Sequence, residues 1–117
     1  MTLIEKTPLA QGTEDGIEWR VIEAPLYGAA NGYVILPEGH PWREKELQFG
    51  DVDIDVHGGI TYGPKDDGWI GFDTLHAWDK WPGSPDFGID EHDIHWTVEM
   101  VVEETKRLAA QVKAVSA

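Results

Sequence analysis

The sequence predicts an α+β fold, in which a small antiparallel sheet is packed against one C-terminal amphipathic helix. Three observations lead to this expectation: a strand-like alternation at residues 17–24, further short apolar runs separated by turn residues, and one long helical pattern at residues 98–115. A chain of 117 residues is the size of one domain, so we expect residues 1–117 to form a single domain.

The first expected strand follows a polar, glycine-containing segment at residues 11–16, which is typical of a turn. In residues 17–24, side chains alternate between two faces, and Ile17, Trp19 and Val21 share one of them. This alternation predicts a half-buried strand.

Asn31 and Gly32 tolerate positive φ and predict a turn before a second short strand at residues 33–37. The two strands are expected to pair as an antiparallel hairpin. Residues 37–50 mix proline, glycine and charge, which predicts a loop with at most one helical turn. His40 in this loop is interpreted as a surface residue, with a flap over the central site as the alternative.

Residues 51–57 alternate acidic and apolar side chains and are expected to form a strand with Asp55 and His57 on one face. Like charges along one strand face repel, which favours a cation or hydrogen-bond donors opposite them, although a solvated face explains them as well. Gly58 and Gly59 follow, and either let a ligand approach closely or form a bulge.

Residues 69–72 predict another strand, and the chain changes character at Asp73. Asp73 is expected to cap a short helix that carries His76 and Asp79 on one side, because residues three apart are neighbours on a helix. A plain cap and a satisfied, half-buried histidine are the alternative interpretation.

Residues 80–96 are rich in proline, glycine and aspartate and predict a long ordered loop anchored by Trp81, Phe87 and Trp96. Thr97 is then expected to cap the terminal helix. Acidic residues come early and basic residues late in this helix, in keeping with its dipole. Its expected apolar stripe comprises Val98, Val101, Val102, Thr105, Leu108, Ala109 and Val112.

Composition excludes several classes of function. The formal charge of −13 repels polyphosphate and anionic lipid, so duplex nucleic acid is not an expected partner. The chain has no cysteine, which excludes disulfides, a thiolate zinc site and a thiol nucleophile. No run approaches the roughly 20 apolar residues that span a bilayer, so we expect no membrane partner and a cytoplasmic location.

The candidate chemistry lies between residues 51 and 79. Carboxylates and imidazoles suit divalent cations, and aspartate–histidine pairs also serve in proton transfer. His57 and His76 are the candidate acid or base. The spacing matches no established metal motif, so no cofactor is certain beyond a possible divalent ion. The candidate metal ligands are Asp55, His57, Asp73, His76 and Asp79.

The blocks VHGGITYG, GWIGFDTLHAWD and HWTVEMVVEETKRLA resemble an uncharacterised family of small bacteriophage and prophage proteins with DVDVHGG(L/I)TY and GFDxxHxxD motifs. The resemblance covers about two thirds of the chain and implies a host-cell location. It brings no catalytic precedent. The shared positions, which are the candidate ligand-binding residues, are His57, Gly58, Gly59, Thr61, Asp73, His76 and Asp79.

Three functions are consistent with these features. The first is sequestration of a small nucleotide-like immune signal by a homo-oligomer, with aromatic rings stacking a base and amides near Gly58 and Gly59 holding phosphate. The second is metal-dependent hydrolysis of a phosphodiester in such a nucleotide. The third is a non-enzymatic structural or protein-interaction module. The first rests on chain size and on analogy with phage counter-defence proteins.

Overall fold

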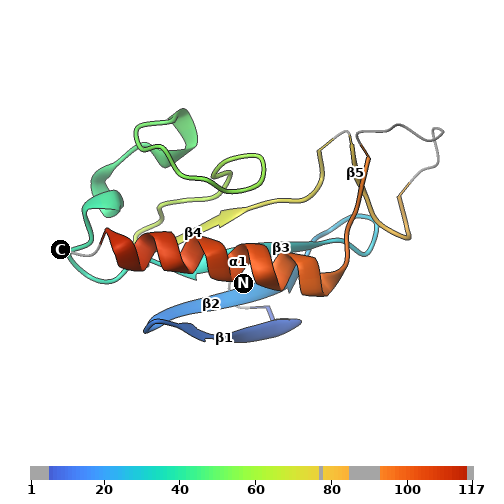
Figure 1. Cartoon of the computed structure of the whole chain (residues 1–117), viewed down its shortest axis with the longest axis horizontal. Coiled ribbons are helices and arrows are strands. Elements are labelled where there is room, and N and C mark those ends of the chain that lie inside the picture. Colours follow the sequence, from blue (N-terminus) through green and yellow to red (C-terminus); the bar gives the residue numbers. More distant parts are fainter. Residues whose placement is uncertain (1–5, 77, 85–92, 116–117) are drawn as a thin grey trace.

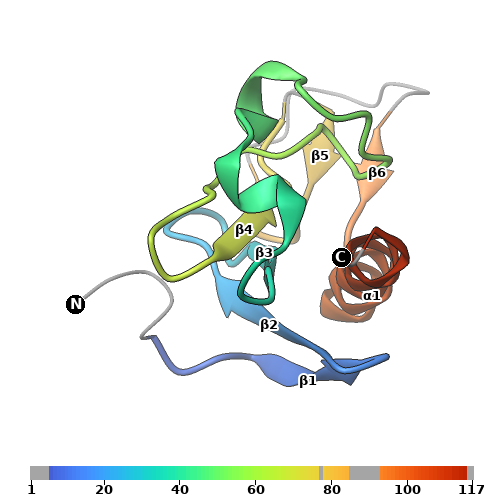
Figure 2. The same cartoon turned by 90° about the vertical axis from the view of Figure 1, so that its left-hand side faces the viewer.

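The computed structural model describes residues 6–76, 78–84 and 93–115 and confirms the α+β fold (Figure 1). An antiparallel sheet is covered on one face by a single long helix, α1 (Val98–Ala114), as Figure 2 shows from the side. The strands of the sheet, in their spatial order, are β1 (Ala10–Glu14), β2 (Ile17–Glu23), β3 (Ala30–Ile35) and β4 (Trp69–Phe72). Two short strands, β5 (Asp79–Lys80) and β6 (Ile94–His95), form a separate parallel pair. Within the described residues, no helix is long and apolar enough to cross a bilayer.

The alternation along β2 places its side chains as predicted. Ile17, Trp19 and Val21 are buried in the core shared with α1. Ile22 points the other way and packs with Tyr33 and Trp69, which are buried on the opposite side of the sheet. Both faces of the sheet are therefore partly covered by apolar residues.

The terminal helix also forms as the sequence predicts. Thr97 caps it, because its Oγ1 accepts a hydrogen bond from the Met100 N–H at 3.2 Å. The expected stripe faces the sheet: five of its residues are buried and the other two are partly buried against the same core. The helix thus supplies one wall of the core.

Two of the predicted turns are placed differently in the structure. The segment expected to be a turn at residues 11–16 is mostly strand β1, and only Asp15 and Gly16, at φ 52° and 85°, make the hairpin turn to β2. The prediction of a turn at Asn31 and Gly32 is wrong, because both residues lie inside β3. The chain turns instead at residues 25–28, ahead of that strand.

Packing explains why Asn31 and Gly32 lie in a strand. Asn31 is buried, and its Oδ1 accepts a hydrogen bond from the Thr74 N–H at 3.1 Å. A Cβ atom at Gly32 would lie 2.1 Å from Oγ1 of Thr105 and 2.5 Å from the ring of Phe72. Gly32 therefore serves the close approach of α1 to the sheet rather than a turn.

The loop before the candidate site contains two short 3₁₀ helices, η2 (Pro41–Glu44) and η3 (Leu47–Phe49). The interpretation of His40 as a surface residue is wrong, since His40 is 3% exposed. Its Nδ1 accepts from the Trp42 N–H at 3.0 Å, and its Nε2 donates to the Val112 carbonyl at 2.9 Å. His40 thus ties this loop to the end of α1.

Residues 51–57 do not form the expected strand, although their burial alternates as in a strand. Side chains of α1 take the place of a neighbouring strand. Gln111 accepts from the Asp55 N–H at 2.9 Å and donates to the Asp55 carbonyl at 2.8 Å, and Glu104 accepts from the His57 N–H at 2.8 Å. The extended segment is therefore fixed along the helix without a β-ladder.

Residues 80–96 carry two of the three expected anchors into the core. Trp81 and Trp96 are buried, and their rings stack with centroids 6.4 Å apart. The third expected anchor, Phe87, lies outside the described residues.

Candidate functional site

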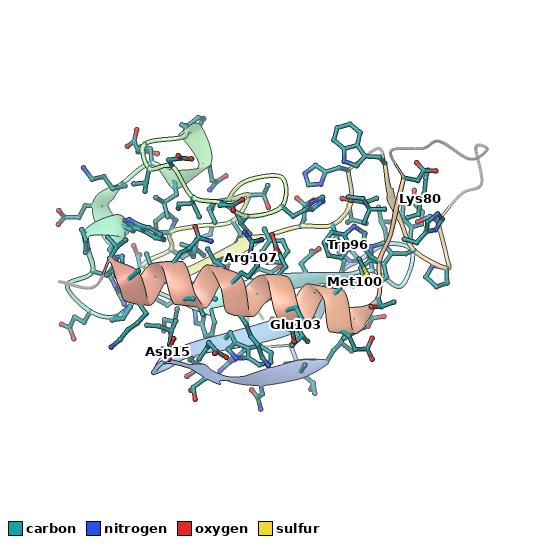
Figure 3. The ribbon with its side chains drawn as sticks, viewed as in Figure 1. Asp15, Lys80, Trp96, Met100, Glu103 and Arg107 are labelled. Carbon is teal, nitrogen blue, oxygen red and sulfur yellow. The ribbon has the colours of Figure 1, made fainter. Side chains whose placement is uncertain are left out.

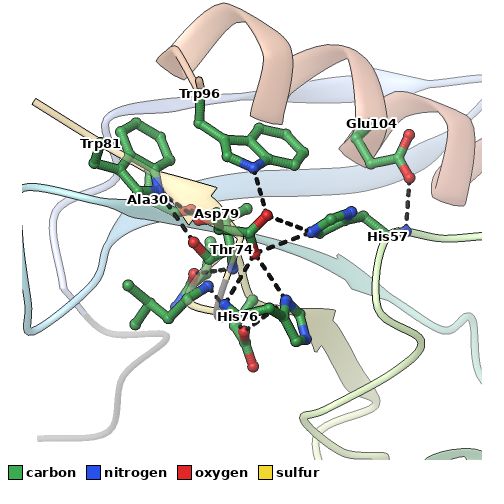
Figure 4. A network of polar contacts seen from close by, with 11 residues as sticks. Ala30, His57, Thr74, His76, Asp79, Trp81, Trp96 and Glu104 are labelled. Carbon is green, nitrogen blue, oxygen red and sulfur yellow. Dashed lines mark hydrogen bonds and ion pairs between the residues drawn. The ribbon is translucent and has the colours of Figure 1, made fainter. Parts of the chain in front are cut away.

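Three separate segments meet beside the first turns of α1 (Figure 4). His57 ends the extended segment held by the helix, His76 lies in the turn after β4, and Asp79 begins β5. The expected short helix after Asp73 is not present in the described residues around it. The side chain of Asp79 instead folds back to accept a hydrogen bond from the His76 N–H at 3.0 Å. His76 and Asp79, three residues apart, are therefore brought together by a side-chain hydrogen bond rather than by a helix.

The carboxylate of Asp79 is the centre of the site. Its side chain is fully buried, whereas His57 and His76 keep 16% and 28% of their side chains exposed. Nε2 of His57 lies 2.9 Å from Oδ1, and Nδ1 of His76 lies 2.8 Å from Oδ2. Because a carboxylate only accepts, these two ring nitrogens carry the protons and donate. We refer to His57, His76 and Asp79 as the His–His–Asp cluster.

Trp96 fixes the cluster from the side of the helix. Its indole N–H donates to Oδ1 of Asp79 at 2.8 Å, and its ring lies edge-on to His57 with centroids 4.8 Å apart. Trp81 stacks behind Trp96, and its own N–H donates to the carbonyl of Thr74 at 3.1 Å. Two buried indoles therefore hold the carboxylate and one imidazole in fixed positions.

Burial alone would raise the pKa of Asp79, because it disfavours the charged form. Hydrogen bonds from His57, Trp96 and His76 outweigh this effect and hold the pKa below its ordinary value. Asp79 is therefore a carboxylate at neutral pH, surrounded by donors.

Gly58 makes room for His76. A Cβ atom at this position would lie 2.3 Å from Cε1 of His76, and the residue has φ 68°. Gly59 also has positive φ, 78°, but a Cβ there would meet nothing within 4 Å. The pair of glycines therefore has two different roles: both shape the backbone, and only Gly58 allows the close contact with an imidazole.

The remaining predicted site residues lie around the cluster. Asp73 is its near neighbour: Oδ1 lies 3.7 Å from Nδ1 of His76 and also accepts from the Leu75 N–H. Asp55 is directed to Arg107 on α1, at 2.6 Å. Thr61 is exposed, and its N–H donates to the carbonyl of Gly71 in β4. The structure thus unites three of the predicted residues, places Asp73 beside them, and positions Asp55 and Thr61 elsewhere.

The glycine pair also borders a hollow of about 370 Å³, whose other walls come from the loop around η3 and the extended segment. Gly58 contacts both this hollow and the ring of His76. The other lining residues do not include His57, Asp73, His76 or Asp79, so this hollow does not lie between the two groups of candidate site residues; they are Leu47, Gln48, Gly50, Val52, Asp53, Ile54 and Ile60.

The cluster could hold a metal ion. His57, His76 and Asp79 each offer one ligand atom, and these atoms all lie within 4.8 Å of one another. Two imidazoles and one carboxylate are ligands that suit zinc and other first-row transition cations better than magnesium or calcium. The Trp96 N–H and the His76 N–H remain on the carboxylate as supporting contacts.

Sequence reasoning missed two supporting residues, Trp96 and Glu104. Trp96 was expected only as an anchor of the loop, and Glu104 only as a charge early in the helix. Neither has a local signal for its role, because each acts on a residue far away in the chain: 17 positions for Trp96 with Asp79 and 47 for Glu104 with His57.

Comparisons with known protein families, curated proteins and solved structures found no match for this chain. The resemblance to small phage proteins therefore stays a prediction.

We predict that Asp79→Asn destabilises the metal-free protein by about 3 kcal/mol at pH 7, because it removes a buried charge that several donors surround. The pKa of Asp79 is lower in the folded protein than in the unfolded chain, where it has its ordinary value of 3.8. The carboxylate therefore stabilises the folded protein above pH 3.8, and this stabilisation is lost as the pH falls through the lower, folded-state pKa. The difference from wild type should therefore shrink below about pH 4. Urea unfolding in EDTA at several pH values measures the free energy of unfolding of both proteins, with Asp66→Asn, at an exposed position, as the charge-matched control. An equal cost at every pH contradicts the prediction.

A second prediction compares Gly58→Ala with Gly59→Ala. Both put a Cβ on a backbone with positive φ, which costs about 1 kcal/mol. Only Gly58→Ala also displaces His76, so it should cost at least about 1 kcal/mol more. The imidazole signals of His76 should shift in nuclear magnetic resonance spectra of Gly58→Ala and stay unchanged in Gly59→Ala. Equal effects of the two substitutions would show that the contact with His76 has no energetic weight.

Proposed function

We propose that this protein binds a divalent cation of the zinc class at the His–His–Asp cluster and uses that cation to capture a small nucleotide-like ligand. The observation that carries the proposal is the convergence of His57 and His76, from two different loops, on the single buried carboxylate of Asp79. Two imidazoles and one carboxylate form a ligand set that suits zinc and other first-row transition cations.

Only modest rearrangement is needed for the cation to bind. The ring nitrogens that face Asp79 would exchange their protons with the opposite ring nitrogens, so that each neutral imidazole presents a lone pair to the metal. Glu104 holds His57 in place and Trp96 holds Asp79, so less conformational entropy is lost when these side chains bind the cation.

The charges close to the cluster favour a cation over a bare anion. Asp73 lies 3.7 Å from His76, and the carboxylate of Glu104 binds the N–H of His57. Together with the total charge of −13, this environment opposes a phosphate that arrives alone. A nucleotide would therefore bind through the metal ion, which supplies the positive charge at the point of contact.

Three protein ligands leave coordination positions for a phosphate oxygen or for water. Trp78, which precedes Asp79 in the chain and is 51% exposed, is an aromatic surface on which a base can stack. A second copy that covered the partly exposed His76 would enclose the ligand, so a homo-oligomer is part of this proposal. Capture without turnover would match the counter-defence role that analogy with small phage proteins of this size suggests.

Hydrolysis of a phosphodiester is the second candidate, and the position of Asp73 favours it. Its Oδ1 lies 3.7 Å from Nδ1 of His76, the nitrogen that would hold the ion, so this carboxylate is close enough to act as a general base. The ion, held by His57, His76 and Asp79, would supply an activated water as the nucleophile, Asp73 would take the proton that this water loses, and solvent would protonate the leaving oxygen. The two candidates share the same cation and differ only in what happens to the ligand.

The metal site is tested with untagged protein. Wild type should bind one Zn²⁺ per chain, and His57→Gln or His76→Gln should weaken binding at least about 100-fold, because each removes one of three ligands. His95→Gln, at an exposed histidine of β6, should leave the affinity unchanged. Competition with a chromophoric chelator at pH 7.5 measures the affinity, and the visible spectrum of the Co²⁺ form reports its ligands. Equal affinity of His57→Gln and wild type would refute the site.

The nucleotide ligand is tested separately with the zinc-loaded protein. Cyclic dinucleotides and ADP-ribose derivatives are incubated with protein, with and without EDTA, and the small molecules are analysed after heat denaturation. Intact nucleotide released only from zinc-loaded protein is the expected result. Loss of the nucleotide that depends on zinc identifies the hydrolase instead. If the protein binds zinc tightly but neither retains nor consumes any nucleotide, the metal site is supported and both nucleotide functions are ruled out.

A further inference from the structure

A shallow groove of about 400 Å³ lies along the first half of α1, and none of His57, His76 and Asp79 lines it. Figure 3 shows Trp96, Met100, Glu103 and Arg107 along the helix. The lining residues are Trp96, Glu99, Met100, Glu103, Glu104 and Arg107. We propose that this groove is a docking surface for a basic segment of a partner protein, whose arginine or lysine side chains lie along it.

The floor of the groove is apolar and partly rigid. Met100 is 39% exposed and lies outside the apolar stripe that α1 buries against the sheet. Trp96 beside it is held by its hydrogen bond to Asp79 and by stacking on Trp81. A fixed indole next to an adaptable methionine suits the aliphatic stem and the charged head of an arginine or lysine.

The rim of the groove is acidic. Glu99, Glu103 and Glu104 supply three carboxylates, and Arg107 is the one cation of the lining. The guanidinium of Arg107 is already paired with Glu104 and with Asp55, so its charge is offset. Glu103 has only a loose contact, 3.9 Å, with Lys106 and keeps 76% of its side chain exposed. Glu99 has no ion-pair partner within the described part of the chain. Negative charge at the rim is therefore available to an incoming cation.

The same charges argue against other occupants. A symmetric contact between two copies would place the carboxylates of one groove against those of the other, which repel. Nucleic acid and anionic lipid meet the same repulsion from a chain of charge −13. A basic segment is attracted at long range and fits the apolar floor at short range.

The test uses the full chain in EDTA, so that it does not depend on the metal site. A fluorescein-labelled decapeptide of alternating arginine and alanine should bind, and the matching glutamate and alanine peptide should not. The double variant Glu99→Gln/Glu103→Gln should weaken binding about 10-fold, because it removes two exposed charge contacts that are each weak. Glu38→Gln/Glu44→Gln, which changes the net charge equally at exposed positions far from the groove, should weaken it less than 2-fold.

The apolar floor is tested by Met100→Ser, which should also weaken binding several-fold while the circular dichroism of α1 stays unchanged. Amide shifts on peptide titration should be confined to residues 96–107. Equal losses for the two charge-matched double variants, or shifts spread over the whole acidic surface, would show that only the overall field attracts the peptide. A dimer whose dissociation constant changes with Glu99→Gln/Glu103→Gln would make a second copy the occupant. Either result would overturn the proposal.

Discussion

The buried carboxylate of Asp79 is the interaction on which the arrangement of the loops depends. It receives hydrogen bonds from two imidazoles, one indole and one backbone amide, and these donors come from three segments of the chain. A buried charge without such donors would be strongly unfavourable. The loop after β4, the extended segment and the stretch before α1 must therefore adopt their positions together. Two of the donors that satisfy the buried charge of Asp79, the imidazoles of His57 and His76, are thus also side chains of the candidate metal site.

The sequence predicted what local periodicity and capping determine. β2 and α1 form where the alternation and the helical stripe indicate, because each buries its apolar face on the other. The grouping of His57 with His76 and Asp79 was also anticipated. Its geometry was not, since the contact of Asp79 with His76 replaces the expected helix.

The errors come from contacts that no local pattern records. Residues 51–57 have the alternation of a strand, yet their partners are the side chains of Gln111 and Glu104 on a helix half the chain away. Asn31 and Gly32 have the composition of a turn, but a buried amide contact and the close approach of Thr105 keep them in β3. In each case tertiary packing overrides local preference.

Because α1 follows the His–His–Asp cluster in the sequence, it is synthesised after the three residues of the cluster. The ribosome makes His57, His76 and Asp79 before it makes Trp96 and Glu104, which hold two of them in place. A nascent chain therefore carries all three side chains of the His–His–Asp cluster in an unorganised form until α1 docks. The cluster is organised only after the segment from Trp96 through α1 has been made and has folded, so a chain that stopped before Trp96 would keep the three side chains and lose their arrangement.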